Sequence, residues 1–129
     1  MTDYIAPIDD MRFAASNLAG FGLIASLPGG GDLNEELLHS IFEEGGKFAS
    51  GVLAPLNRVG DRQGSNLVNG AVKTPDGWPE AYRHFVDGGW NAVPFDEDFG
   101  GQGLPYLVAT ALFELWHSSN MAFALCPML

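Results

Sequence analysis

The stretch LPYLVATALFELW, residues 104–116, carries the pattern that decides the fold. Its apolar residues recur at spacings of three and four, which places them on one side of an α-helix. Pro105 stands at the start, where a missing N–H costs a helix nothing. The pattern therefore predicts a helix that buries one face in a core. That face consists of Leu104, Leu107, Val108, Ala111, Leu112, Leu115 and Trp116.

A second stripe with the helical period follows residue 32. Asp32 or Asn34 is expected to cap this helix, and two glutamates in the first turn suit the helix dipole. Gly45 takes one place in the stripe, which favours close approach of a neighbouring element. Pro55 is expected to bend or end the helix near Ala54. The apolar positions are Leu37, Leu38, Ile41, Phe42, Phe48, Ala49, Val52, Leu53 and Leu56.

Shorter elements complete the prediction. An Asn-Gly pair within residues 65–77 predicts a small hairpin or an irregular loop. A helix from Trp78 to about Asp87 is expected to turn Tyr82, Phe85 and Val86 inward. Near the N-terminus, residues 11–21 predict a short helix whose apolar side holds Met11, Phe13, Ala14 and Leu18.

These elements predict an all-α helical bundle. The triple glycine at residues 29–31 is the best internal boundary because glycine runs are flexible joints. We therefore expect a short N-terminal helical extension, residues 1–31, followed by a helical domain, residues 32–129.

Composition excludes several classes of function. The chain has 129 residues with 16 acidic and 6 basic side chains, a net charge of −10. Such a surface repels phosphate backbones and anionic lipid, which argues against nucleic acid and membrane surfaces as partners. No apolar run reaches the roughly 18 residues that a membrane span needs. The opening MTDYIAPIDDM does not resemble a secretory signal, so we expect a cytoplasmic protein.

Reactive side chains are not grouped in the sequence. His39, His84 and His117 lie on separate predicted helices without a second ligand at metal-binding spacing, so no metal site is expected. The pair Glu43-Glu44 is interpreted as part of a solvated helix face. Cys126 lies in an apolar run and is predicted to be a buried packing thiol. No catalytic residue is assigned to this chain.

The loop FDEDFGGQGLP, residues 95–105, allows two interpretations. Glycines before a helix could cradle a phosphate on free N–H groups. The loop lacks the spacing of a dinucleotide fingerprint and the lysine of a P-loop. A tight connector is favoured, with Phe95 and Phe99 expected to anchor it on the core.

The same residues resemble the N-terminal domain of flavin-dependent acyl-CoA dehydrogenases. That domain has a Gly-Trp segment, an acid, an aromatic, Gly-Gly-x-Gly and a helix carrying Glu-Leu. The opening MTDYIAPIDDMRF is similar to the longer subgroup that includes 3-methylmercaptopropionyl-CoA dehydrogenases. The matching positions are Gly89-Trp90, Glu97, Phe99, Gly100 to Gly103 and Glu114-Leu115, together with Ala54-Pro55, Asn57 and Asp61.

The resemblance implies that this chain is one part of a longer, oligomeric enzyme that binds FAD, oxidises acyl-CoA and passes electrons to an electron-transfer acceptor. The catalytic base and most FAD contacts would lie in the remaining domains, so no cofactor-binding residue is assigned here. The resemblance assigns one wall of the acyl-chain pocket to Phe123, Ala124 and Pro127.

The C-terminal run MAFALCPML, residues 121–129, carries no charge. Burying its large side chains elsewhere would contribute about 1.5–3 kcal/mol each, so we expect an uncovered apolar face there. The alternative to the enzyme hypothesis is a stand-alone helical module that docks on another protein through this face.

Overall fold

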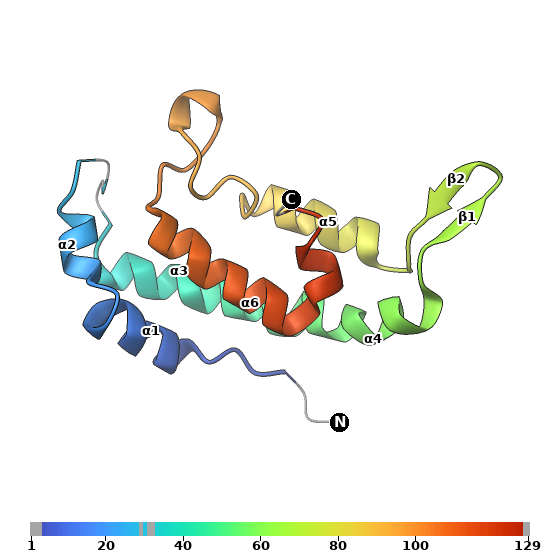
Figure 1. The fold of residues 1–129 in the computed structure, drawn as a ribbon, viewed down its shortest axis with the longest axis horizontal. Helices are drawn as coiled ribbons and strands as arrows, with labels where there is room; N and C mark the ends of the chain where they lie inside the picture. Colours follow the sequence, from blue (N-terminus) through green and yellow to red (C-terminus); the bar gives the residue numbers. More distant parts are fainter. Residues whose placement is uncertain (1–3, 29, 31–32, 128–129) are drawn as a thin grey trace.

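The computed structural model describes residues 4–28, 30 and 33–127 (Figure 1). It confirms the all-α class, since the described residues contain helices and a single two-stranded hairpin. The elements are α1 (Ile8–Asn17), α2 (Phe21–Ala25), α3 (Glu35–Phe48), a π-helical turn η1 (Ala49–Leu53), α4 (Ala54–Gln63), β1 (Asn66–Val68), β2 (Ala71–Lys73), α5 (Trp78–Asp87), a 3-10 turn η2 (Glu97–Phe99) and α6 (Tyr106–Ala124).

One continuous helical rod forms the base of the bundle. It passes from α3 through η1 into α4, and α6 runs beside it in the same direction (Figure 1). α5 runs in the opposite direction, and α1 packs against α3. The core therefore lies where the rod, α5 and α6 meet, and its largest fully buried side chains include Trp116, Phe42, Phe85, Leu53, Leu112 and Leu115.

Gly45 explains the close approach of α3 and α6. A Cβ atom at this position would lie 2.6 Å from Leu112 Cδ2 and 3.3 Å from Leu115 Cδ1. The side chains of Leu112 and Leu115 fill the space beside Gly45 that a larger residue would need. The prediction that a neighbouring element packs closely at this glycine is confirmed.

Pro55 does not end the helical rod, so the predicted helix end is wrong, while the predicted bend stays a prediction. Instead the chain makes the π-helical turn η1, in which Ala54 N donates to Ala49 O, and α4 begins with Pro55 in its first turn. Proline is tolerated in the first turn of a helix because its N–H would have no partner there. The wider turn lets the rod continue past the proline.

Two predicted inward faces are partly wrong. In α1 the buried residues are Met11 and Ala15, whereas Phe13 and Leu18 are exposed. The helix face that packs on α3 therefore differs from the face that the apolar residues predict. In α5, Phe85 is buried as predicted, but it is joined by Ala81, while Tyr82 and Val86 are exposed.

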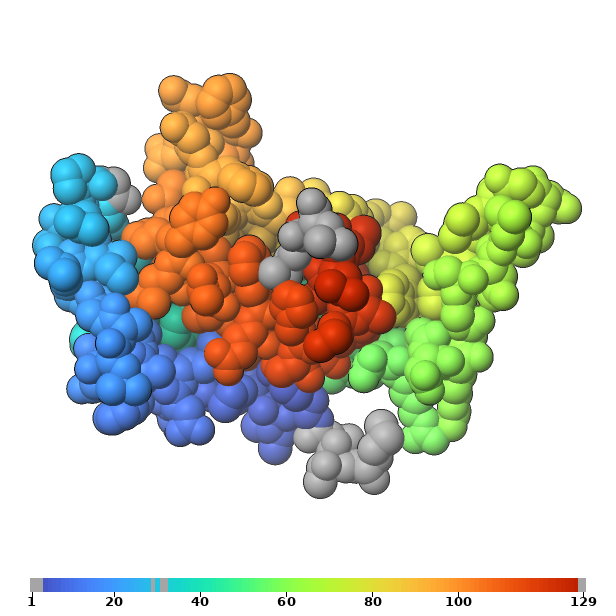
Figure 2. Space-filling view, viewed as in Figure 1, coloured from blue at the N-terminus to red at the C-terminus, as the bar shows by residue number. Residues whose placement is uncertain are grey.

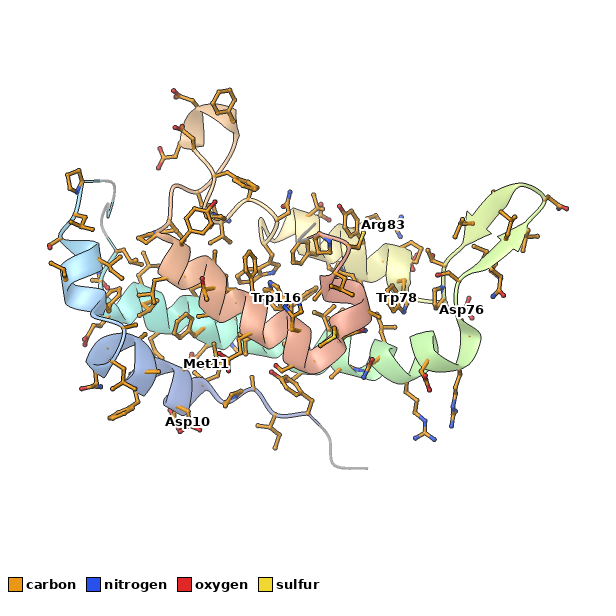
Figure 3. The ribbon with its side chains drawn as sticks, in the orientation of Figure 1. Asp10, Met11, Asp76, Trp78, Arg83 and Trp116 are labelled. Atoms are coloured by element: carbon orange, nitrogen blue, oxygen red, sulfur yellow. The ribbon has the colours of Figure 1, made fainter. Side chains whose placement is uncertain are left out.

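The predicted Asn-Gly hairpin is confirmed. Asn69 and Gly70 have φ angles of 52° and 81°, as a tight two-residue turn requires. The hairpin projects from the bundle (Figure 2). Its base is held by Gln63, which donates to Asp76 Oδ2 and accepts from Asp76 N. Asp76 and Trp78 lie near this base (Figure 3).

Met11, Ala15 and Phe21 of the N-terminal part belong to the same core cluster as the rest of the bundle. The division into residues 1–31 and 32–129 stays a prediction. None of the helices in the described part of the chain has the length and apolar character needed to cross a bilayer.

Candidate functional site

An aromatic cluster lies beneath the C-terminal half of α6. Trp116 is fully buried at its centre (Figure 3). Its ring centroid lies 5.4 Å from that of Phe48, 5.9 Å from Phe85 and 5.6 Å from Trp90, at interplanar angles of 88°, 79° and 66°. Edge-to-face contacts of this kind stabilise beyond the area they bury. The cluster therefore forms a rigid support for the end of α6.

Phe123 extends this cluster toward α5. Its ring centroid lies 5.8 Å from Phe85, 5.9 Å from Trp78 and 6.4 Å from Tyr82. Phe123 is 2% exposed and Ala124 is fully buried. One face of the terminal turn of α6 is thus part of the core.

α6 is kinked at Asn120, which has non-helical angles of φ −158° and ψ 86°. The side-chain amide of Asn120 is buried and makes two hydrogen bonds. Nδ2 donates to Leu53 O at 3.1 Å, and Oδ1 accepts from Phe123 N at 3.1 Å. The kink therefore lies directly against the π-helical turn η1, which ends at Leu53.

The opposite face of the terminal turn is bare. Met121 is 59% exposed and Leu125 is 47% exposed. The predicted uncovered apolar face is confirmed for these two residues and is wrong for Phe123, which is buried. Met128 and Leu129 lie outside the described residues.

The structure places the three predicted pocket residues together at the end of α6. Phe123 and Ala124 face the core, whereas Pro127 is half-buried just beyond the helix. Their contact with an acyl chain stays a prediction. Sequence reasoning missed Asn120, because an asparagine in a helical pattern does not by itself indicate a buried amide.

Cys126 is exposed, so the prediction of a buried packing thiol is wrong. The apolar sequence around it suggested burial. In the structure α6 ends at Ala124, and the following turn carries Leu125 and Cys126 away from the core.

In the glycine-rich loop, the N–H groups of residues 100–104 are not available to a phosphate. The five backbone N–H groups of residues 100–104 all donate to carbonyls of residues 92–97, at 2.8 to 3.0 Å. A phosphate cradle needs such groups unpaired. The connector interpretation is therefore correct.

Phe95 and Phe99 do not anchor this loop, contrary to prediction. They are 56% and 90% exposed. The loop is held by its own backbone instead, and Gly101 packs so closely on it that a Cβ atom there would lie 2.0 Å from Phe95 O. Backbone hydrogen bonds replace the aromatic anchors that the sequence suggested.

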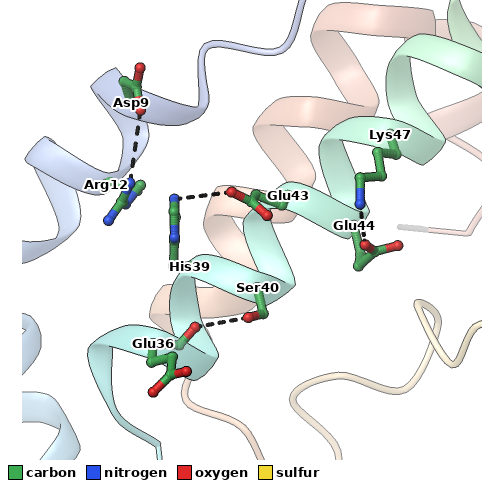
Figure 4. Close-up of polar contacts among 8 residues, drawn as sticks. All are labelled: Asp9, Arg12, Glu36, His39, Ser40, Glu43, Glu44 and Lys47. Atoms are coloured by element: carbon green, nitrogen blue, oxygen red, sulfur yellow. Dashed lines mark hydrogen bonds and ion pairs between the residues drawn. The ribbon is translucent and has the colours of Figure 1, made fainter.

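A groove between α1 and α3 is lined by apolar residues such as Ile8 and by charged residues such as Arg12 and Glu43. Figure 4 shows the polar contacts of these two helices. Arg12 Nη1 lies 3.9 Å from Asp9 Oδ1, and His39 Nε2 lies 3.5 Å from Glu43 Oε1. These pairs join neighbouring turns of one helix, and Glu43 is exposed, which agrees with a solvated helix face.

Next to this groove, Lys47 Nζ donates to the carboxylate of Glu44. That hydrogen bond, together with the charge of Glu44, raises the pKa of Lys47 above its ordinary value. Within the described residues no three His, Cys, Asp or Glu side chains are grouped so that they could hold a metal ion. The groove therefore carries ion pairs of a helix surface.

The resemblance seen in the sequence is confirmed by comparison with known proteins. The chain is homologous to part of an acyl-CoA dehydrogenase, an oxidoreductase. The relative is 3-methylmercaptopropionyl-CoA dehydrogenase from Ruegeria pomeroyi, which is 36% identical over 126 residues. The match covers 98% of this chain and 21% of the relative, so the chain spans about a fifth of its length. No family model matches the chain.

Proposed function

We propose that this chain is the N-terminal helical domain of an FAD-dependent acyl-CoA dehydrogenase, which forms the α,β double bond of an acyl-CoA thioester. The match over 98% of the chain to such an enzyme carries the proposal. Residues 1–31 would be a helical extension of this domain, and residues 32–129 the domain itself.

The role we assign to the domain is one wall of the acyl-chain pocket, formed by residues 121–127. Acyl chains need apolar, largely preformed walls. The terminal turn of α6 suits this role because Met121 and Leu125 are bare on one side, while Phe123 is fixed in the aromatic cluster on the other. Pro127 has exposed surface and would contact substrate directly, whereas Phe123 and Ala124 would shape the wall from within.

We assign the catalytic base and the flavin site to the remainder of the enzyme. The glycines of the loop are unsuited to a flavin pyrophosphate because the N–H groups of residues 100–104 already donate to carbonyls. We therefore assign no role in flavin chemistry to the residues of this chain. The whole enzyme would work with an electron-transfer acceptor, as a homo-oligomer in the cytoplasm, and the isolated chain is expected to be inactive.

The test is to purify the full-length enzyme and follow its visible spectrum. Bound flavin should colour the protein, and anaerobic addition of an acyl-CoA should bleach the flavin band. A colourless full-length protein, or a flavin that no acyl-CoA reduces, would contradict the proposal. A stable complex of this chain with a protein that binds no flavin would favour the interaction module instead.

The pocket wall is tested by Pro127→Phe in the full-length enzyme. A larger side chain at the wall should lower kcat/KM for long acyl-CoA substrates more than for short ones, since pocket walls discriminate by about 10-fold or more per methylene-sized change. Pro94→Phe is the matched control, because Pro94 is also half-buried but lies just before the glycine-rich loop. If both substitutions changed kcat/KM for long and short substrates equally, Pro127 would not be part of the pocket wall.

A further inference from the structure

The buried amide of Asn120 stands out in the core. Asn120 is 1% exposed, and the only other buried polar side chain among the described residues is that of Ser119. Burying an amide is unfavourable unless its donor and acceptor are both bonded. In Asn120 both ends are bonded, to Leu53 O and to Phe123 N.

These two hydrogen bonds act at two breaks in helical structure. At the kink of α6, Oδ1 takes the place of a helix carbonyl for Phe123 N, as a capping side chain does at the start of a helix. Across the core, Nδ2 reaches the last residue of the π-helical turn, 67 residues earlier in the chain. The amide thus ties the turn after the kink to the rod of α3, η1 and α4.

This connection sets the rotation of the terminal turn. Successive residues of an α-helix are rotated by about 100° around the axis, since 3.6 residues make one turn. A slip by one residue would therefore move Phe123 out of the aromatic cluster and bring another side chain in. With Asn120 in place, Phe123 is buried and Met121 is exposed.

We propose that Asn120 is a positioning residue that fixes the rotation of residues 121–127 and, through it, the acyl-chain preference of the enzyme. The second half of this inference rests on the proposed function, in which that segment lines the pocket. Asn120 itself is buried and touches no substrate. The chemistry of dehydrogenation would be left unchanged by its removal.

The structural half is tested on this chain by amide hydrogen exchange. In Asn120→Ala, the Phe123 amide should exchange about tenfold faster, which corresponds to the loss of one net hydrogen bond. Asn120→Asp keeps an acceptor for Phe123 N and should retain most of the protection. Ser119→Ala is the control, because the Ser119 hydroxyl bonds to Trp116 O within the same helix. Exchange in Asn120→Ala that matches the control would overturn the inference.

The functional half is tested in the full-length enzyme by the ratio of kcat/KM for long and short acyl-CoA substrates. Asn120→Ala should change this ratio about threefold to tenfold, in the range of discrimination by one methylene. The kcat for the best substrate should stay within about twofold, because only binding of the acyl chain is altered. Asn120→Asp should recover part of the parent ratio.

A destabilised control separates positioning from stability. Phe42→Leu alters a fully buried side chain of α3, away from the kink, and should lower the melting temperature without changing the ratio. If the parent enzyme is active and Asn120→Ala keeps the parent ratio of kcat/KM values, the inference is contradicted and the proposed function is not. The same holds if Phe42→Leu changes this ratio as much as Asn120→Ala does. A parent that oxidises no acyl-CoA would contradict the proposed function and the functional half with it.

Discussion

The kinked end of α6 and the glycine-rich loop of residues 95–104 both depart from regular structure, but they are stabilised in opposite ways. At the kink, a buried side chain bridges 67 residues of sequence to reach Leu53. In the loop, the backbone N–H groups of residues 100–104 bond to carbonyls of residues 92–97, at most 11 positions away. The aromatic residue of the first region, Phe123, is buried, whereas Phe99 in the second is 90% exposed.

The comparison shows that an irregular segment can be stabilised either by local backbone hydrogen bonds or by tertiary contacts. The loop can hold its shape with local bonds, so its side chains are free to face outward. The kink depends on contacts with two other elements, η1 and α5. Substitutions at the kink should therefore affect the whole bundle, and substitutions in the loop should stay local.

The largest expected effect contrasts two phenylalanines. Phe123→Ala should lower the free energy of unfolding by about 3–5 kcal/mol, because it removes a buried ring and leaves a cavity. Phe99→Ala should change it by less than about 0.5 kcal/mol, as for other exposed side chains. Urea denaturation followed by tryptophan fluorescence measures both. Comparable losses in the two variants would break the comparison.

A smaller loss is expected from Asn120→Leu, which keeps the side-chain volume but removes the amide. It leaves Phe123 N buried without its acceptor and removes the bond to Leu53 O, which should lower the free energy of unfolding by about 2–4 kcal/mol. Asn91→Leu is the control in the loop region, where Asn91 is exposed. An Asn120→Leu variant as stable as the parent in urea denaturation would show that the amide is not needed to hold the kink.

Gly101→Ala sharpens the comparison from the side of the loop. A Cβ atom 2.0 Å from Phe95 O forces the loop to shift, and we expect a loss of about 1–2 kcal/mol. The aromatic near-UV circular dichroism should be unchanged, because Trp116, Phe48 and Phe85 lie on helices outside the loop. Gly51→Ala is the control: no neighbouring atom lies within 4 Å of its Cβ position, and it should be neutral or stabilising. A changed aromatic spectrum in Gly101→Ala would mean that the loop is coupled to the core.

The smallest effect concerns Lys47, which belongs to neither region. Its pKa is raised above 10.5 by the hydrogen bond to Glu44. A raised folded-state pKa contributes stability that is fully present below the unfolded pKa and is lost as pH rises through the folded value. The stabilities of the parent and of Lys47→Met should therefore differ only slightly, and the difference should shrink as the pH rises above 10.5 and through the raised pKa of Lys47. A difference that grows with pH would contradict the assigned cause.

Local patterns predicted the parts that depend on neighbouring residues. The hairpin at Asn69-Gly70, the helix from Trp78 to Asp87 and the core face of α6 are all confirmed. Each depends on backbone angles or on a 3.6-residue period, which a short stretch of sequence determines.

The wrong predictions share a different cause. Phe13, Phe99 and Cys126 are exposed although the sequence analysis placed each of them on or in the core. Apolar character indicates that burial is favourable, but whether a side chain is buried depends on which elements pack against it. The sequence placed Phe123, Ala124 and Pro127 close together, while packing decided that Phe123 and Ala124 are buried and Pro127 is half-buried.

The sequence by itself determined a helical bundle, the hairpin and a relationship to an acyl-CoA dehydrogenase, because these depend on residue period, turn chemistry and residue identity. Only the tertiary structure decided that η1 continues the rod past Pro55 and that Asn120 reaches Leu53. The reason is physical: a hydrogen bond between residues 67 positions apart leaves no periodic signal. It exists only when packing brings the two breaks together.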